Sequence, residues 1–341
     1  MSKILIIYTG GTIGMVRNPR TGALEPCTAA NLTAAVPEIS RFGAEIETAN
    51  FEQAIDSSDM MPSHWALLVD IIEANYSRYS GFVILHGTDT MAFTASALSF
   101  MLRGLSKPVI LTGSQLPLGA IRTDAKENLI TAIEIAAATD PSGAPLVSEV
   151  CIYFHDQLLR GNRASKASAN SLTAFVSSNY PVLADTGTDI AYHREFLRRP
   201  SPGEAFEPWR KMDSGIVILS LFPGLQREAV SPVLESDRVR GIIFRTFGSG
   251  NAPHNGWLVD SLRSAVAAGK TIVNITQCAT GSVEMERYET GRQLLDAGVV
   301  SGHDSTVEAA LTKLMYLMGH SLPQGEIRRL MNTDLRGEVT L

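Results

Sequence analysis

The sequence has few cysteines and no long apolar run. Its three cysteines, Cys27, Cys151 and Cys278, are far apart and form no CxxC or Cys/His cluster, which argues against a zinc site of the usual spacing. The odd number gives no disulfide framework and suits a reducing compartment. No apolar run approaches the roughly 18 residues that a transmembrane helix needs. The apolar stretch at 4–7 is also too short for the core of a signal peptide. We therefore expect a cytoplasmic protein without a membrane partner.

Positive charge and aromatic residues are also scarce. Lysine and arginine number 29, against 35 aspartates and glutamates, and the formal net charge is −6 at pH 7. This balance argues against a protein that binds nucleic acid through a general positive field. Aromatic residues make up 7% of the chain, which suits a sheet-and-helix protein better than an aromatic-rich recognition module. The 341 residues, 45% of them hydrophobic, indicate a folded protein with two domains or one large one.

Short apolar runs alternate with segments of helical spacing. The segments 63–79, 89–102 and 124–138 repeat apolar residues at intervals of three and four, which predicts helices. Runs rich in valine and isoleucine are typical of strands buried on both faces. These runs are Ile4–Tyr8, Gly81–Leu85, Pro108–Leu111, Val150–Phe154, Ile216–Leu221, Gly241–Phe244 and Thr271–Ile275. The alternation predicts an α/β fold with largely parallel sheets.

The apolar rhythm stops between Tyr180 and Asp213, where prolines and charged residues cluster. Such a composition is typical of a linker. We therefore predict a larger N-terminal domain over residues 1–185, a linker over 186–213 and a smaller C-terminal domain over 214–341.

Hydroxyl groups and glycines follow three of the predicted strands. The segments are Thr9-Gly10-Gly11-Thr12-Ile13-Gly14, His86-Gly87-Thr88-Asp89-Thr90 and Thr112-Gly113-Ser114-Gln115. In open α/β sheets ligands bind at the carboxyl ends of the strands, so we expect these segments to lie close together. The first segment is neither GxGxxG nor a phosphate loop ending in GK[ST], which argues against a nucleotide site.

A threonine at such a strand end needs a base before it can act as a nucleophile. Asp89 alone is a poor base when ionised and solvated. A buried lysine with a lowered pKa would serve better. Lys166 is a candidate, but Lys107 and Lys126 compete for the role, and the spacing does not decide between them.

The motifs together resemble the bacterial asparaginase family, in its cytoplasmic type I branch, over nearly the whole chain. The segments that carry the resemblance are TGGTIG at 9–14, HGTDTMAFTASALSFML at 86–102, KPVILTGSQLPL at 107–118, RTDAKENL at 122–129, RGNRASKA at 160–167, FGSGNAP at 247–253, NITQC at 274–278 and VEAALTKL at 307–314.

The resemblance implies hydrolysis of L-asparagine to L-aspartate and ammonia, without a metal or another cofactor. Thr12 would attack the side-chain amide and form an acyl-threonine intermediate. Thr88, Asp89 and Lys166 would pass protons and help to activate water. The residues that the resemblance implies for substrate binding are Asp56, Ser57, Ser58, Thr88, Asp89 and Ser114. On the residues alone, Ser57 and Ser58 would be interpreted as a turn or a helix cap.

One feature of the family is absent. Many members carry a tyrosine on the loop that follows the GGTIG segment, but no tyrosine occurs here between Tyr8 and Tyr76. We hypothesise that this loop still closes as a lid, and that water, Glu25 or Lys166 activates Thr12.

The resemblance also implies a second asparagine site and an assembly. Arg245, Thr276 and Cys278, with Ser165 nearby, match an effector site of the cytoplasmic branch, although a buried arginine and a core cysteine explain the same residues. The family is usually a homotetramer built as a dimer of dimers, in which Asn251 would approach a neighbouring active site.

Three alternatives stay open. The protein could be a broader asparaginase/glutaminase, a subunit of a tRNA-dependent amidotransferase, or a non-catalytic amino-acid sensor on the same scaffold. A serine hydrolase is disfavoured because the sequence has no GxSxG. His86 is interpreted as a structural strand-end histidine rather than a base.

Overall fold

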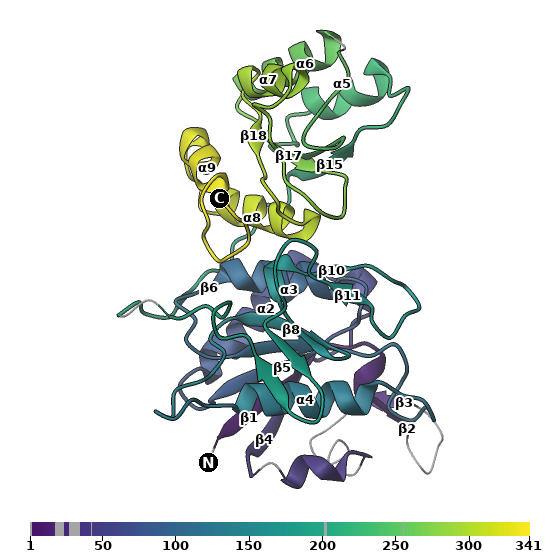
Figure 1. Ribbon diagram of the computed structural model, residues 1–341, viewed down its shortest axis with the longest axis vertical. Coiled ribbons are helices and arrows are strands. Elements are labelled where there is room, and N and C mark those ends of the chain that lie inside the picture. Colours follow the sequence, from purple (N-terminus) through teal and green to yellow (C-terminus); the bar gives the residue numbers. More distant parts are fainter. Residues whose placement is uncertain (1, 18–23, 27–34, 42, 201–202, 255) are drawn as a thin grey trace. The chain divides into compact units, whose positions relative to one another are not determined.

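The computed structural model describes residues 2–17, 24–26, 35–41, 43–200, 203–254 and 256–341 (Figure 1). The chain divides into two compact units, Met1–Arg210 and Lys211–Leu341. Within the described part of the chain, no helix is both long and apolar enough to cross a membrane.

The N-terminal unit is built on an eight-stranded sheet with the order β13-β12-β9-β8-β7-β5-β1-β4. The five strands from β8 to β4 run parallel, and β9, β12 and β13 continue the sheet antiparallel. The predicted strands in this unit are confirmed, because apolar runs buried on both faces form the middle of the sheet. The strands are β1 (Lys3–Tyr8), β4 (Glu45–Asn50), β5 (Gly81–Leu85), β7 (Val109–Thr112), β8 (Val150–Phe154), β9 (Gln157–Arg160), β12 (Ala184–Thr186) and β13 (Ile190–Tyr192).

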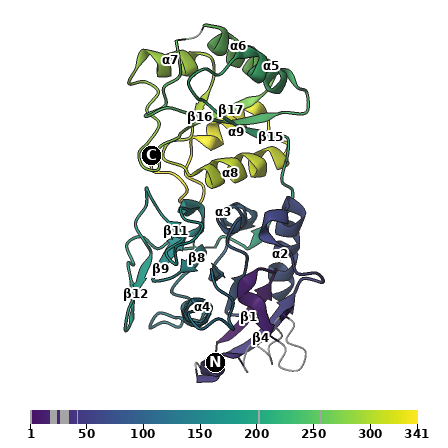
Figure 2. The ribbon, with the colours of Figure 1, turned by 90° about the vertical axis from the view of Figure 1, so that its right-hand side faces the viewer.

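Helices cover both faces of this sheet (Figures 1 and 2). Ile4, Ile6 and Tyr8 of β1 point to one face and share a core with α4. Alternate residues of a strand point to opposite faces, and α2 and α3 pack on the other side, where α3 lies against β7 and β8. The helices are α2 (Pro62–Asn75), α3 (Met91–Met101) and α4 (Ala125–Ala137), and all three agree with the predicted segments.

Short elements complete the unit. They are the two-stranded pairs β2 (Met15–Arg17) with β3 (Leu24–Pro26), β6 (Leu102–Arg103) with β14 (Glu207–Pro208), and β10 (Ser165–Lys166) with β11 (Phe175–Val176), and the 3₁₀ turns η1 (Thr12–Gly14), η2 (Pro37–Arg41), η3 (Ser57–Asp59) and η4 (Gly161–Arg163).

Most of the segment predicted as a linker belongs to the N-terminal unit. The segment 186–213 contains β13, and the division between the units falls after Arg210. A buried ion pair fixes this stretch, since Arg160 Nε lies 2.6 Å from Glu149 Oε2. Arg160 also donates to the carbonyl of Phe196 at 2.7 Å, and Glu149 accepts from the amide of Arg198 at 2.8 Å. These long-range contacts leave no trace in local composition.

The C-terminal unit is a four-stranded parallel sheet with the order β15-β16-β17-β18. Helices α5, α6 and α7 share a core with Ile242, Phe244 and Ile272 on one face, and α8 packs on β15, β16 and β17 from the other. The elements are β15 (Ile216–Ser220), β16 (Gly241–Thr246), β17 (Thr271–Thr276), β18 (Val300–Ser301), α5 (Arg227–Glu235), α6 (Gly256–Ala267), α7 (Glu289–Asp296), α8 (Val307–Gly319) and α9 (Gln324–Met331). The predicted parallel α/β architecture is confirmed here too.

Candidate active site

The three segments predicted to meet at the carboxyl edge of the sheet do meet there. Strands β1, β5 and β7 are neighbours, with Tyr8 opposite Leu85 and Leu85 opposite Thr112. Just beyond the strands, the amide of Thr9 donates to the carbonyl of Leu85 at 3.1 Å, and the amide of His86 donates to that of Thr112 at 2.9 Å. The ladder of hydrogen bonds therefore continues into the polar segments and fixes their spacing.

Glycines let these segments approach each other closely. Gly11 has φ +82°, and a Cβ at this position would lie 2.6 Å from the backbone of Gly87. A Cβ on Gly87 would in turn lie 2.5 Å from the hydroxyl of Ser57. Only glycine tolerates both the left-handed conformation and the contact at Gly11. The segments that carry Thr12, Thr88 and Ser57 are thus held together, and the side chain of Thr12 is exposed.

Lys166 reaches this edge from a distant hairpin. Its Nζ donates to Thr88 Oγ1 at 2.8 Å and lies 2.6 Å from Asp89 Oδ1. The lysine side chain is 18% exposed and the aspartate side chain 62%, so the ion pair faces solvent on the carboxylate side only. A lysine amine, a hydroxyl and a carboxylate in contact can exchange and orient protons.

The two competing lysines are engaged elsewhere. Lys107 donates to the carbonyls of Tyr76 and Tyr79, and burial lowers the pKa of its amine. Lys126 lies 2.7 Å from Glu38. Of the three candidates, therefore, the structure brings only Lys166 to Thr88.

The segment 56–58 lies beside Asp89. The Asp56 carboxylate accepts from the amide and from the hydroxyl of Ser58, each at 2.9 Å, and these hydrogen bonds lower the pKa of Asp56. The buried Ser57 accepts from the amide of Asp89 at 3.3 Å and, through its carbonyl, from the Thr90 hydroxyl at 2.6 Å. The turn interpretation is therefore correct for local structure, and the same turn sits next to the candidate proton-transfer group.

Ser114 and Gln115 follow β7 at the same edge. The Ser114 hydroxyl is buried and has no hydrogen-bond partner among the described residues. Gln115 Nε2 donates to the carbonyls of Ala169 and Ser171, at 3.3 and 3.0 Å, in the turn of the hairpin that carries Lys166. Sequence reasoning missed Gln115, and the only available signal was its place directly after Ser114.

His86 is buried and neutral. Burial lowers its pKa to about 4, so at neutral pH Nδ1 donates to the carbonyl of Gly87 at 2.6 Å and Nε2 accepts from Thr94 at 2.9 Å. Thr94 also accepts from the indole of Trp65 at 3.0 Å. Both ring nitrogens are engaged, which agrees with a structural role.

Comparison with known proteins decides the family. The family model "Asparaginase, N-terminal" matches residues 3–198, and "Glutaminase/Asparaginase C-terminal domain" matches residues 215–331. The chain belongs to the asparaginase family. It is 42% identical to L-asparaginase 1 of Escherichia coli K12 over 348 residues, with 99% of this chain and 98% of that protein covered.

Solved structures agree with this family assignment. The crystal structure of L-asparaginase I from Vibrio cholerae O1 biovar eltor matches with a TM-score of 0.87 and 41% identity, covering 100% of this chain and 99% of that one. The thermostable L-asparaginase from Thermococcus kodakarensis matches with a TM-score of 0.88 and 35% identity, covering 99% of each chain. The predicted membership and the two-domain α/β fold are both confirmed.

Part of the asparaginase lid hypothesis falls outside the described residues. Glu25 lies in β3, opposite Val16 of β2, so the two arms of the loop form a short hairpin. Residues 18–23, which connect β2 to β3 in the sequence, and Cys27 are not among the described residues.

Three of the predicted effector residues lie at or just beyond the carboxyl edge of the C-terminal sheet. Thr276 ends β17, donates to the carbonyl of Gly248 at 2.6 Å and accepts from the amide of Cys278 at 3.0 Å. Arg245 is in β16, and its Nε is buried without a hydrogen-bond partner among the described residues. Cys278 is an exposed free thiol. Ser165 belongs to β10 of the N-terminal unit.

The titratable groups form no evident metal centre. Over the ranges that the structure describes, histidine, cysteine, aspartate and glutamate make no cluster of three or more that could hold a metal ion. The site described above consists of hydroxyls, an amine and carboxylates.

Proposed function

We propose that this protein hydrolyses L-asparagine to L-aspartate and ammonia through an acyl-threonine intermediate. The observation that carries the proposal is the contact of Lys166 Nζ with both Thr88 Oγ1 and Asp89 Oδ1. These groups sit beside the segment that presents Thr12. A protein that only binds amino acids has no need of two hydroxyls together with an amine.

In the first half of the reaction, Thr12 Oγ attacks the carbon of the substrate's side-chain amide. The hydroxyl proton passes to the departing nitrogen, the C–N bond breaks, and ammonia leaves an ester on Thr12. In the second half, Thr88 and Lys166 help to activate a water molecule, which attacks this ester. A proton from the water passes to Thr12 Oγ as the ester bond breaks and L-aspartate departs. Asp89 keeps Lys166 in place and supplies a counter-charge.

The zwitterionic end of asparagine matches the groups around Asp89. The Asp89 carboxylate, 62% exposed, is suited to the α-ammonium group. The turn at Asp56, Ser57 and Ser58 offers hydroxyl and backbone donors to the α-carboxylate. The Ser114 hydroxyl, buried without a partner among the described residues, is suited to the side-chain amide.

Ammonia release from asparagine and glutamine over a concentration series tests this proposal. The wild-type chain should release ammonia from asparagine, and Thr12→Ala should reduce kcat by roughly a thousandfold or more. Hydroxylamine should divert the acyl intermediate of the wild type to aspartyl hydroxamate. Full activity in Thr12→Ala would overturn the mechanism. The glutamine arm distinguishes a broader amidase, because one methylene changes binding by only about 1–3 kcal/mol without special geometry.

The proposal includes a second asparagine site in the C-terminal unit, at Arg245, Thr276 and Cys278. The half-buried Arg245, whose buried Nε has no hydrogen-bond partner among the described residues, supports it, because an arginine fork suits a carboxylate. Rates should then rise sigmoidally with asparagine concentration. Arg245→Ala should make the curve hyperbolic, with Arg240→Ala as the control. A curve that is already hyperbolic in the wild type contradicts activation by asparagine.

The proposal further includes a homotetramer assembled as a dimer of dimers and a cytoplasmic location, as the family resemblance implies. Sedimentation velocity on the full chain tests the assembly, and fractionation of the source cells tests the location. A monomer at assay concentration would contradict the first.

A further inference from the structure

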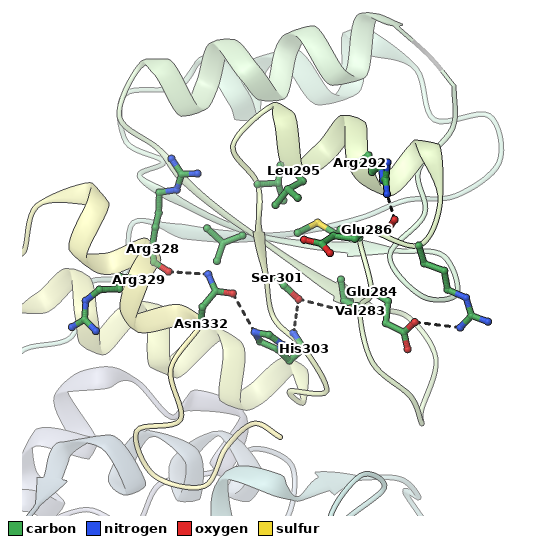
Figure 3. Close-up of a pocket in the computed structure, with 14 residues that line it drawn as sticks. Val283, Glu284, Glu286, Arg292, Leu295, Ser301, His303, Arg328, Arg329 and Asn332 are labelled. Atoms are coloured by element: carbon green, nitrogen blue, oxygen red, sulfur yellow. Dashed lines mark hydrogen bonds and ion pairs between the residues drawn. The ribbon is translucent and has the colours of Figure 1, made fainter. Parts of the chain in front are cut away.

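A cavity in the C-terminal unit has the size of a small-molecule site. Its volume is about 800 Å³, within the roughly 300–1,000 Å³ typical of such sites. The segment 283–287 beyond β17 forms one part of the wall, and Val299, Val300, Ser301 and His303 in and beside β18 form a second. Residues of α7 and α9, with Asn332, complete it (Figure 3). The cavity thus lies along β18, the strand at one edge of the C-terminal sheet. Arg245, Thr276 and Cys278 are not among the residues that line it.

Two of the arginines that line the cavity are already paired. Arg287 lies 3.2 Å from Glu284, and Arg329 lies 2.7 Å from Glu326 on the same helix. Their charges are therefore largely compensated, and they add little to the attraction of a ligand.

Two other arginines keep donors available. Arg292 uses Nε to donate to the carbonyl of Glu286 at 3.0 Å. The guanidinium of the half-buried Arg328 makes no hydrogen bond or ion pair with any other described residue. It lies over Gly298, where a Cβ would come within 3.4 Å of Nη2, so the glycine leaves room for it. A guanidinium with free donors binds a carboxylate through two parallel hydrogen bonds.

Apolar side chains line the cavity beside these charges. Leu295 is 41% exposed and borders the cavity. Val283, Met285 and Val299 line the same cavity and are themselves buried. The cavity thus offers a hydrocarbon surface next to a cationic group.

The remaining wall is held rigidly by hydrogen bonds (Figure 3). His303 has φ +53°, a conformation that costs a non-glycine residue about 1–3 kcal/mol. Its amide donates to Ser301 Oγ at 3.1 Å, its ring bonds to Asn332 Oδ1 at 3.1 Å, and its carbonyl accepts from the amide of Val283 at 3.0 Å. A strained residue fixed on three sides indicates a wall whose shape is specified.

We propose that this cavity binds a small organic anion with an apolar body. Arg328 holds its carboxylate, and its hydrocarbon part packs on Leu295 and Met285. Glu286 also lines the cavity, and its negative charge keeps the ligand's carboxylate at the Arg328 end.

Hexanoate is a suitable probe, with hexanol and hexylamine as matched neutral and cationic probes. Isothermal titration of the full-length chain should show binding of hexanoate, at least about tenfold weaker binding of hexanol, and still weaker binding of hexylamine, since the charged hydrogen bonds distinguish them. Absence of hexanoate binding at millimolar concentrations, or equal binding of hexylamine, would overturn the proposal.

Three variants assign the binding to this cavity. Arg328→Gln should weaken hexanoate binding by about tenfold or more, whereas Arg329→Gln, whose charge is already paired with Glu326, should leave it within about twofold. Leu295→Asp, which adds a negative charge to a half-exposed helical position, should abolish binding. Circular dichroism establishes that each variant is folded. Equal affinity in the wild type and Arg328→Gln would place the anion elsewhere and defeat the proposal.

Discussion

His86 illustrates how one buried side chain can support the candidate active site without taking part in the chemistry. It joins the carbonyl of Gly87 to the hydroxyl of Thr94, and Gly87 packs against Gly11 and Ser57. Protonation of the ring would remove the acceptor that Thr94 uses. Burial lowers the pKa of His86 to about 4, which keeps this chain of hydrogen bonds intact at neutral pH.

The pKa of His86 makes stability depend on pH in a defined window. In the unfolded chain His86 has its ordinary pKa of about 6.5, and in the folded chain its pKa is about 4. Between these two pH values the unfolded chain binds a proton that the folded chain does not, so the free energy of unfolding falls as the pH falls. Between pH 6.5 and pH 5 this amounts to roughly 2 kcal/mol. His86→Asn keeps a donor for the Gly87 carbonyl but has no titrating group. Its free energy of unfolding in urea should therefore decline less over this interval than that of the wild type; equal declines would contradict the assignment.

At the scale of elements, the hairpin β10–β11 decides whether Lys166 reaches Thr88. Gln115 Nε2 holds the turn of this hairpin through two carbonyl groups, of Ala169 and Ser171. Gln115→Glu keeps the shape of the side chain, removes both donors and sets a carboxylate against the carbonyls. We expect kcat for asparagine to fall by roughly tenfold to a hundredfold, because small displacements of a positioned group are costly.

The matched variant Gln115→Met removes the two hydrogen-bond donors without adding a carboxylate that repels the carbonyl groups. It therefore separates the effect of losing the donors from the effect of this repulsion. It should also lower kcat, though less than Gln115→Glu, and it should leave KM nearly unchanged if Lys166 acts mainly after substrate binding. The pH profile of kcat should shift in both variants, since Lys166 would lose its fixed position near Asp89. An unaltered kcat and pH profile in Gln115→Glu would mean that Gln115 does not position Lys166.

The elements that could be predicted from the sequence are those buried on both sides. Strands such as β1 and β5 are continuous apolar runs because helices cover both of their faces. Strands β4 and β13 were missed, since each lies at an edge of the sheet and exposes much of its surface, as the sequences Glu-Ile-Glu-Thr-Ala-Asn and Ile-Ala-Tyr reflect. The meeting of the three polar segments at one edge of the sheet could be predicted, because the carboxyl ends of neighbouring parallel strands lie together. The contact of Lys166 with Thr88 could not be predicted, because the two residues are 78 positions apart in the sequence and only the folded chain brings them together.

At the scale of the whole molecule, the proposed function places one asparagine site in each of the two units. If asparagine bound in the C-terminal unit raises the affinity of the N-terminal site for asparagine, asparagine at the N-terminal site must raise the affinity of the C-terminal site by the same factor. The effect is thus an equilibrium property of the chain and can be measured without turnover. A variant without the proposed nucleophile Thr12 makes this measurement possible, because asparagine can then occupy both sites without being hydrolysed.

Calorimetric titration of Thr12→Ala with asparagine should therefore reveal a second bound molecule per chain, with positive coupling of about 1–3 kcal/mol between the sites. The double variant Thr12→Ala/Arg245→Ala should bind a single molecule, at the N-terminal site. The affinity of this variant for asparagine should equal that of the N-terminal site of Thr12→Ala when the C-terminal site is empty. The control Thr12→Ala/Arg240→Ala changes an exposed arginine paired with Asp213 and should retain both sites. If Thr12→Ala itself binds only one asparagine per chain, Arg245 serves the packing of the C-terminal sheet and no effector site exists there.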